Sequence, residues 1–340
     1  MDGDRGLKSF LNRALRASVC AQRAACRPLA DYSGRMPSVA LPLFLVFHAA
    51  PGQRDASGAA HHAAGRLRAA GRQVGLCPAC RTDDLGAAIG RAVNAAREAR
   101  GVVVAVGDDS AHNAVAQAVW NAHLVMGVLP QGVRHFFGSA HGMPTDLDPA
   151  VDALLAAHPE PVPVGRVGER LFLVGASVGL YPHWIGERSR GTALLADLAR
   201  LLRGKSVMTL ELQAQGETRV VRTRTLFVCS NTLHLKAMGL REPLAVEAGR
   251  LAAIAVAPSP PLATLWQALR GSIGRLDGAE RADRFAFDHL AVQPRRGQAR
   301  MEIAIDGDIQ SLPAPLVFQP APRPLMLLVP PAGRGAGAAP

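Results

Sequence analysis

The stretch "ARGVVVAVGDDSAHNAVAQAVW", residues 99–120, decides the fold class of this chain. It holds an apolar run that ends in Gly107, a short acidic turn at Asp108 and Asp109, and then apolar residues at helical spacing. A strand that passes through a glycine into a helix commonly builds a phosphate site, because the helix points its amino-terminal N–H groups and the positive end of its dipole at the anion. The turn therefore predicts an anion-binding loop, even though no lysine lies near it.

The same alternation continues on both sides of this stretch. Apolar runs typical of strands occupy 43–48, 72–77, 101–106 and 124–130, and helical patterns occupy 56–71, 83–99 and 110–122. Short apolar runs separated by helices of ten to fifteen residues indicate β-α-β units. This half is therefore predicted to form a parallel sheet covered on both faces.

After about residue 160 the pattern changes to short strands split by turn residues. The expected strands are 170–180, 206–215, 217–231, 249–258, 285–294 and 299–311, with one helix at 194–204. This pattern predicts an antiparallel β-sandwich. The fold class is thus α/β plus β, divided into a basic N-terminal extension at 1–40, an α/β domain at 41–160 that 316–330 completes, a β-sandwich at 161–315 and a disordered tail at 331–340.

Composition narrows the possible partners. The chain has 38 Lys and Arg against 27 Asp and Glu, a net charge of +11, which favours anionic partners. Nucleic acid is not expected, because aromatic residues make up only 4% of the chain and sit mostly in the apolar runs. Five cysteines at uneven spacing do not suggest a disulfide framework, which favours a cytoplasmic protein. No apolar run is long enough to span a membrane.

The N-terminal extension permits two interpretations. Residues 5–27 place apolar side chains at helical spacing with Lys and Arg largely elsewhere on the helix, a pattern that suits an anionic bilayer surface. The alternative is a disordered extension, or a true start at Met36, just before the first strong strand. Peripheral contact with the inner membrane face is therefore one expectation for this chain.

The segment "VAVGDDSAHNAV" resembles the "GGDGTxNEV" motif of the diacylglycerol kinase catalytic domain family, which includes bacterial lipid kinases and sphingosine kinases and is distantly similar to NAD kinases. The matching positions are Gly107, Asp109, Asn113 and Val115. The differing positions are Asp108, Ser110, Ala111 and Ala114, which replace two glycines, threonine and glutamate.

Further motifs follow in the family's order. "GVLPQGVRHFFGSAHGMP" is similar to "lPlGTxNDFAraLgiP" and keeps Gly132, while "HAAPG" keeps only Gly52 of "NPxSG". "EIAIDGDIQS" is similar to the terminal "vDGE" hairpin, with Asp306 at its aspartate and Asp308 in place of the glutamate. The resemblance covers about residues 41–330, and its strength lies in this collinearity.

The resemblance implies an NAD-kinase-like α/β domain and a β-sandwich lipid domain, with ATP and Mg²⁺ used to phosphorylate a diacylglycerol-like lipid hydroxyl at a membrane surface. It implies Asp306 or Asp109 as the general base. The residues expected around the nucleotide are Gly52, Gly107, Asp108, Asp109, Ser110, Asn113, Gly132 and Arg134. The metal ligands are not specified, and a homodimer stays open.

Several alternatives stay open beside this hypothesis. Asp108 or Asp109 is also a typical N-cap, and Asp306 is also the first residue of a typical Asp-Gly hairpin turn. The replaced motif residues leave a second function open: a catalytically inactive relative that binds lipid or nucleotide and acts through a partner. "CPAC" at 77–80 is interpreted as incidental, because no second CxxC or His pair stands at metal-ligand spacing. The pair His61 and His62 is not expected to bind a metal, because adjacent residues do not share one face of the predicted helix.

Overall fold

The computed structural model describes residues 41–48, 54–80, 84–132, 135–179, 207–214, 216–230, 250–256, 282–295 and 298–331. All of them belong to one compact unit, Ser38–Pro340. The N-terminal extension, the helix expected at 194–204 and the tail after residue 331 lie outside the described residues. None of the described helices is long and apolar enough to cross a bilayer.

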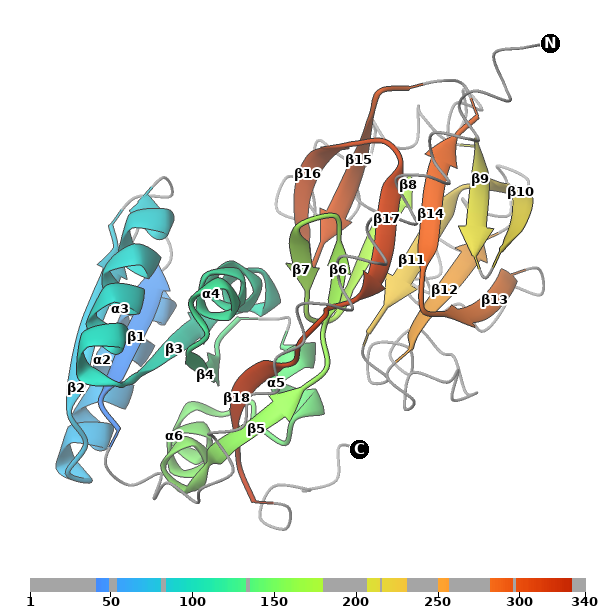
Figure 1. The fold of residues 1–340 in the computed structure, drawn as a ribbon. Coiled ribbons are helices and arrows are strands. Elements are labelled where there is room, and N and C mark those ends of the chain that lie inside the picture. Colours follow the sequence, from blue (N-terminus) through green and yellow to red (C-terminus); the bar gives the residue numbers. More distant parts are fainter. Residues whose placement is uncertain are drawn as a thin grey trace, which may run out of the picture. The chain divides into compact units, whose positions relative to one another are not determined.

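The α/β half follows the predicted alternation closely (Figure 1). Its elements are β1 (Leu43–His48), α2 (Arg54–Ala69), β2 (Val74–Ala79), α3 (Leu85–Ala99), β3 (Val102–Gly107), α4 (Asp109–Ala122) and β4 (Val125–Pro130). The strands pair in parallel in the order β2-β1-β3-β4. Helices α3 and α4 contact each other, as do α2 and α6 (Leu147–Ala156), so helices cover the two faces of the sheet.

The end of the sheet is built from segments far apart in the sequence. Strand β18 (Leu325–Val329) lies parallel to β4, and β5 (His158–Val162) pairs antiparallel to β18. The chain thus returns to the first sheet near its C-terminus, as predicted, but only through Leu325–Val329. The prediction that 316–330 as a whole completes this half is wrong for Leu316–Pro320, which pairs with strands of the second half. The sequence did not predict α5 (Phe136–Ala140), α6 or β5, because α5 is a single short helix and prolines interrupt the other two.

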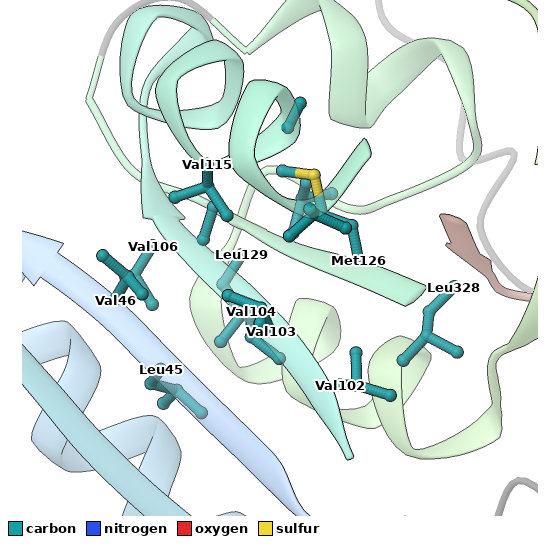
Figure 2. Packing of buried hydrophobic residues seen from close by; sticks show 14 of the residues in the cluster. Leu45, Val46, Val102, Val103, Val104, Val106, Val115, Met126, Leu129 and Leu328 are labelled. Atoms are coloured by element: carbon teal, nitrogen blue, oxygen red, sulfur yellow. The ribbon is translucent and has the colours of Figure 1, made fainter. Parts of the chain in front are cut away.

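The α/β core consists mainly of small and branched aliphatic side chains. Every residue of β3 and β4 is buried, which explains why both strands appear as continuous apolar runs in the sequence. Figure 2 shows Val102, Val104 and Val106 spaced along β3, in the buried cluster that also contains Val115 of α4 and Leu129 of β4. This packing fixes where β3 and β4 end, and therefore where the loops that follow them lie.

The second half forms two antiparallel sheets. One has the strand order β10-β9-β14-β17-β6-β7 and the other β13-β12-β11-β8-β15-β16. Their bounds are β6 (Gly165–Val167), β7 (Arg170–Phe172), β8 (Gly175–Gly179), β9 (Met208–Ala214), β10 (Glu217–Thr223), β11 (Thr225–Cys229), β12 (Leu251–Val256), β13 (Ala282–Phe287), β14 (Leu290–Pro294), β15 (Arg300–Ile305), β16 (Asp308–Pro313) and β17 (Leu316–Pro320). Both sheets contribute side chains to one apolar cluster, so this half is the predicted β-sandwich.

Three apolar runs that the sequence predicts as single strands are each divided between the two sheets. The run at 217–231 becomes β10 and β11, the run at 170–180 becomes β7 and β8, and the run at 285–294 falls in β13 and β14. In the second case Leu173 and Val174 form the crossing and pack into the α/β core, whereas Phe172 and Ala176 pack into the sandwich core. The crossing at Leu173–Gly175 is therefore the place where the two cores meet.

Candidate functional site

The candidate site lies at the carboxyl ends of β1, β3 and β4, and the loops after β3 and β4 are the ones that the structure describes. From β1 the chain proceeds outward to β2 and then returns to β3 on the other side of β1, so the strand order reverses there. Ligands of open α/β sheets bind in the crevice outside such a reversal. The site residues expected in the loop after β1 and beside Gly132, namely Gly52 and Arg134, lie outside the described residues.

The loops after β3 and β4 lie against each other. The backbone N–H of Gln131 donates to the carbonyl oxygen of Gly107 at 2.8 Å. Gly132 has φ +98°, a conformation that favours glycine, and a Cβ there would lie 3.6 Å from the Cβ of Asp108. A Cβ on Gly107 would lie 2.7 Å from the Cβ of Ala111, closer than real Cβ atoms approach. The structure therefore brings Gly107, Asp108 and Gly132 together and keeps their backbones close.

The two aspartates of the opening turn have different structural roles. Asp108 is the N-cap of α4, and its Oδ1 accepts a hydrogen bond from the N–H of Ala111 at 3.1 Å. The capping interpretation is therefore correct for Asp108. Ser110 lies half-buried in the first turn of the same helix, directly after Asp109.

Asp109 instead holds the start of another helix. Its Oδ2 accepts from the N–H of Phe136 at 3.0 Å and its Oδ1 from the N–H of Phe137 at 3.1 Å, at the first residues of α5. The side chain is buried, with 4% of the residue surface exposed. Each carboxylate oxygen accepts one of these bonds, which leaves each with a second lone pair.

A buried histidine lies beside Asp109. His112 has no exposed surface, and among the described residues neither ring nitrogen has a hydrogen-bond partner of good geometry. Its Nδ1 lies 4.0 Å from Asp109 Oδ1. Burial lowers the pKa of His112, which the charges of Asp109 and Asp108 only partly offset, so the ring is neutral at neutral pH.

Asp306 occupies the two-residue turn between β15 and β16. Asp306 has φ +47° and Gly307 φ +96°, as a type I′ hairpin turn requires, so the Asp-Gly turn interpretation is correct. The side chain also points into the junction between the two cores. Its Oδ1 accepts from the N–H groups of Val174 and Gly175, both at 2.9 Å, and its Oδ2 accepts from the N–H of Leu173 at 2.6 Å.

The fourth donor to Asp306 comes from α4. Asn113 Nδ2 donates to Asp306 Oδ2 at 2.7 Å and to the carbonyl oxygen of Leu171 at 2.9 Å. Burial raises the pKa of Asp306 to about 7; the three backbone donors oppose the shift and the charge of Asp109 adds to it. Because Asp109 and Asn113 are four residues apart on one helix, they share its face toward Asp306.

Sequence reasoning missed Gln117 and the amides of Leu173–Gly175. Gln117 Oε1 accepts from the N–H of Leu171 at 2.9 Å, one helical turn beyond Asn113. The spacing of Asn113 and Gln117 was the available signal, since polar residues four apart form one polar stripe on a helix. The amides gave no signal, because backbone donors are not visible in a sequence.

The other polar groups considered in the sequence have separate structural surroundings. Cys77 is buried within β2 while Cys80 is exposed just after it. The His61 ring contacts the carbonyl of Ser57, and His62 pairs with Asp148. Across the described part of the chain, no three His, Cys, Asp or Glu side chains gather as a metal site.

Comparison with known proteins identifies the domain. The family model of the diacylglycerol kinase catalytic domain matches residues 42–167. A crystal structure of a diacylglycerol kinase from Bacillus anthracis strain Sterne has a TM-score of 0.61 at 14% identity and covers 86% of this chain and 97% of its own. Two structures of diacylglycerol kinase-like proteins from that strain have TM-scores of 0.63 and 0.60 at 15% identity, and cover 86% of this chain and 98% of their own. Residues 42–167 thus match the model of the diacylglycerol kinase catalytic domain, and the chain has the two-part fold of these bacterial proteins.

Proposed function

We propose that the protein is an ATP-dependent lipid kinase that transfers the γ-phosphoryl group to the hydroxyl of a diacylglycerol-like lipid. The observation that carries the proposal is the hydrogen bond between Asn113 and Asp306. It joins α4, the helix that begins at the phosphate loop, to the sandwich hairpin. A nucleotide bound at the α/β crevice and a lipid bound by the sandwich would therefore meet beside Asp109.

Phosphate would be held by backbone groups. The loops after β3 and β4 bring Gly107 and Gly132 together at the N-terminus of α4, where the helix dipole favours negative charge. No lysine is needed for such binding. Arg134, next to this loop in the sequence, is the side chain that we expect to add positive charge.

In the transfer, the acceptor oxygen bonds to the γ-phosphorus as the bond from that phosphorus to the bridging oxygen breaks. ADP leaves with the electron pair, and the hydroxyl proton passes to a carboxylate. We assign that carboxylate to Asp109, because each of its oxygens accepts a single amide and keeps a lone pair. Placement of the reactants and stabilisation of charge supply the rest of the rate enhancement.

The described residues do not form a magnesium site of their own. Mg²⁺ prefers several oxygen ligands in octahedral geometry, but Asp108, Asp109 and Asp306 all accept hydrogen bonds from N–H groups. Any Mg²⁺ would arrive with the nucleotide phosphates. We assign it no protein ligand and no step.

The test is transfer of label from γ-labelled ATP into diacylglycerol in mixed micelles. The wild type should label the lipid, and Asp109→Asn should lower the rate by about 10²- to 10⁴-fold, the usual contribution of a general base. Asp146→Asn is the matched control, because Asp146 is an exposed N-cap of α6 whose side chain makes no capping hydrogen bond. Absence of label with the wild type, across diacylglycerol, monoacylglycerol and sphingosine, would refute the proposal.

One observation favours the second function, an inactive relative that binds nucleotide or lipid. The N–H of Ala111, at the start of α4, donates to the Asp108 carboxylate and is therefore not free to bind phosphate. This negatively charged side chain also stands where the family motif has a glycine. In that case the wild type should bind nucleotide or lipid without transferring label.

A further inference from the structure

The carboxylate of Asp306 has no free acceptor position. A carboxylate has about four lone-pair sites, and those of Asp306 are filled by Leu173, Val174, Gly175 and the Asn113 amide, all within 2.9 Å. All these groups are donors. A proton on Asp306 would have to displace one of them and leave that N–H unsatisfied.

The segment that Asp306 holds is fixed from its other side as well. Ser230, directly after β11, donates its Oγ to the carbonyl oxygen of Leu173 at 2.8 Å, and its N–H donates to the carbonyl oxygen of Val174 at 3.1 Å. The N–H groups of this short crossing are thus bound by the turn after β15, and the carbonyl oxygens of Leu173 and Val174 by the residue after β11. Such a network stabilises one backbone geometry at the meeting point of the two cores.

From these contacts, and building on the proposed function, we infer that Asp306 is a positioning residue: it locks α4 and the Leu173–Gly175 crossing to the sandwich hairpin, while the substrate proton goes elsewhere. Asn113 belongs to the same lock, since it is the single donor from the α/β half among the four. Asn113, the part of the lock that lies on α4, is one helical turn from Asp109. Its loss would therefore misplace the phosphate loop relative to the lipid domain.

The first test needs no enzymatic activity. Hydrogen exchange is measured by mass spectrometry on peptides covering 171–176 in the wild type, Asn113→Ala, Asp306→Ala and the double variant. Asp306→Ala should speed exchange of the 173–175 amides by about ten- to hundredfold, the factor expected for losing a charge-assisted hydrogen bond. Asn113→Ala should speed it less, and the double variant should match Asp306→Ala. If the 173–175 amides of Asp306→Ala exchanged as slowly as those of the wild type, the inference would be overturned.

The second test separates positioning from proton transfer. As a lock, Asp306→Ala and Asn113→Ala should lower kcat by similar factors, with the KM for ATP unchanged. If Asp306 were instead the base, Asp306→Ala would abolish transfer, whereas Asn113→Ala would keep it and shift its acid limb. That pattern would also overturn the inference.

Failure of the proposed kinase function can be distinguished from failure of the proposed Asp306 lock. If Asp306→Ala does not fold, Asn113→Ala carries both tests alone, because it removes one donor and leaves the hairpin turn intact. If the wild type transfers no phosphate, the proposed function fails, and the exchange measurement still decides whether Asp306 forms the lock.

Discussion

Replacing Asp109 by alanine should loosen α5 as well as lower activity. The carboxylate accepts hydrogen bonds from the N–H groups of Phe136 and Phe137, and only 4% of the Asp109 surface is exposed. Hydrogen bonds to charged groups contribute about 1.5–3 kcal/mol each, and the loss of a helix cap costs about 0.5–2 kcal/mol. Because the two bonds share one carboxylate, we expect a loss of about 3 kcal/mol for Asp109→Ala. Asp109→Asn keeps one acceptor oxygen and should lose about half of that.

The assay is thermal unfolding together with hydrogen exchange of a peptide covering 135–141. At this chain length a loss of about 3 kcal/mol lowers Tm by about 4 °C, and exchange should rise in the α5 peptide before it rises elsewhere. Asp146→Ala serves as the control, because this exposed cap residue makes no side-chain capping bond. If Asp109→Ala had the Tm of the control and wild-type exchange at α5, the carboxylate would not hold this helix.

Three further outcomes follow from the structure. Gly107→Ala should lower the free energy of unfolding by about 1–3 kcal/mol, because the new Cβ would lie 2.7 Å from the Cβ of Ala111. Adding Ala111→Gly should recover part of that loss. If denaturant titrations showed that the effects of the two substitutions simply add, this explanation would be contradicted. Burial lowers the pKa of His141 to about 4, so as the pH falls the unfolded chain binds a proton on this histidine before the folded chain does. The free energy of unfolding should therefore fall by up to about 3 kcal/mol between pH 6.5 and 4. A His141→Gln variant whose free energy of unfolding fell equally steeply over that range would contradict this. Exposed Cys80 should react with maleimide in the native protein, whereas Cys229, whose pKa burial raises to about 12, should react only after unfolding, as peptide mapping would show.

The α/β sheet was predictable because its signal is local. Each strand buried on both faces appears as an apolar run, and each helix as a spacing of apolar residues, as in 101–106 and 110–122. The division of 217–231 between two sheets was not predictable, because β10 and β11 differ in their partners and not in their strand character. The position of Asp306 in a hairpin turn was likewise local. Its hydrogen bonds were not, since Asn113 is 193 residues away along the chain and the other donors are backbone amides.

The proposed kinase activity requires that nucleotide phosphate binds where β3 and β4 end. Hydrogen exchange of the wild type with and without millimolar magnesium ATP tests it directly, because bound phosphate would protect the amides that hold it. Protection should be confined to peptides covering 107–113 and 131–137, and Gly132→Val should abolish it. Unchanged exchange in both peptides at saturating nucleotide, or protection only in other parts of the chain, would contradict it.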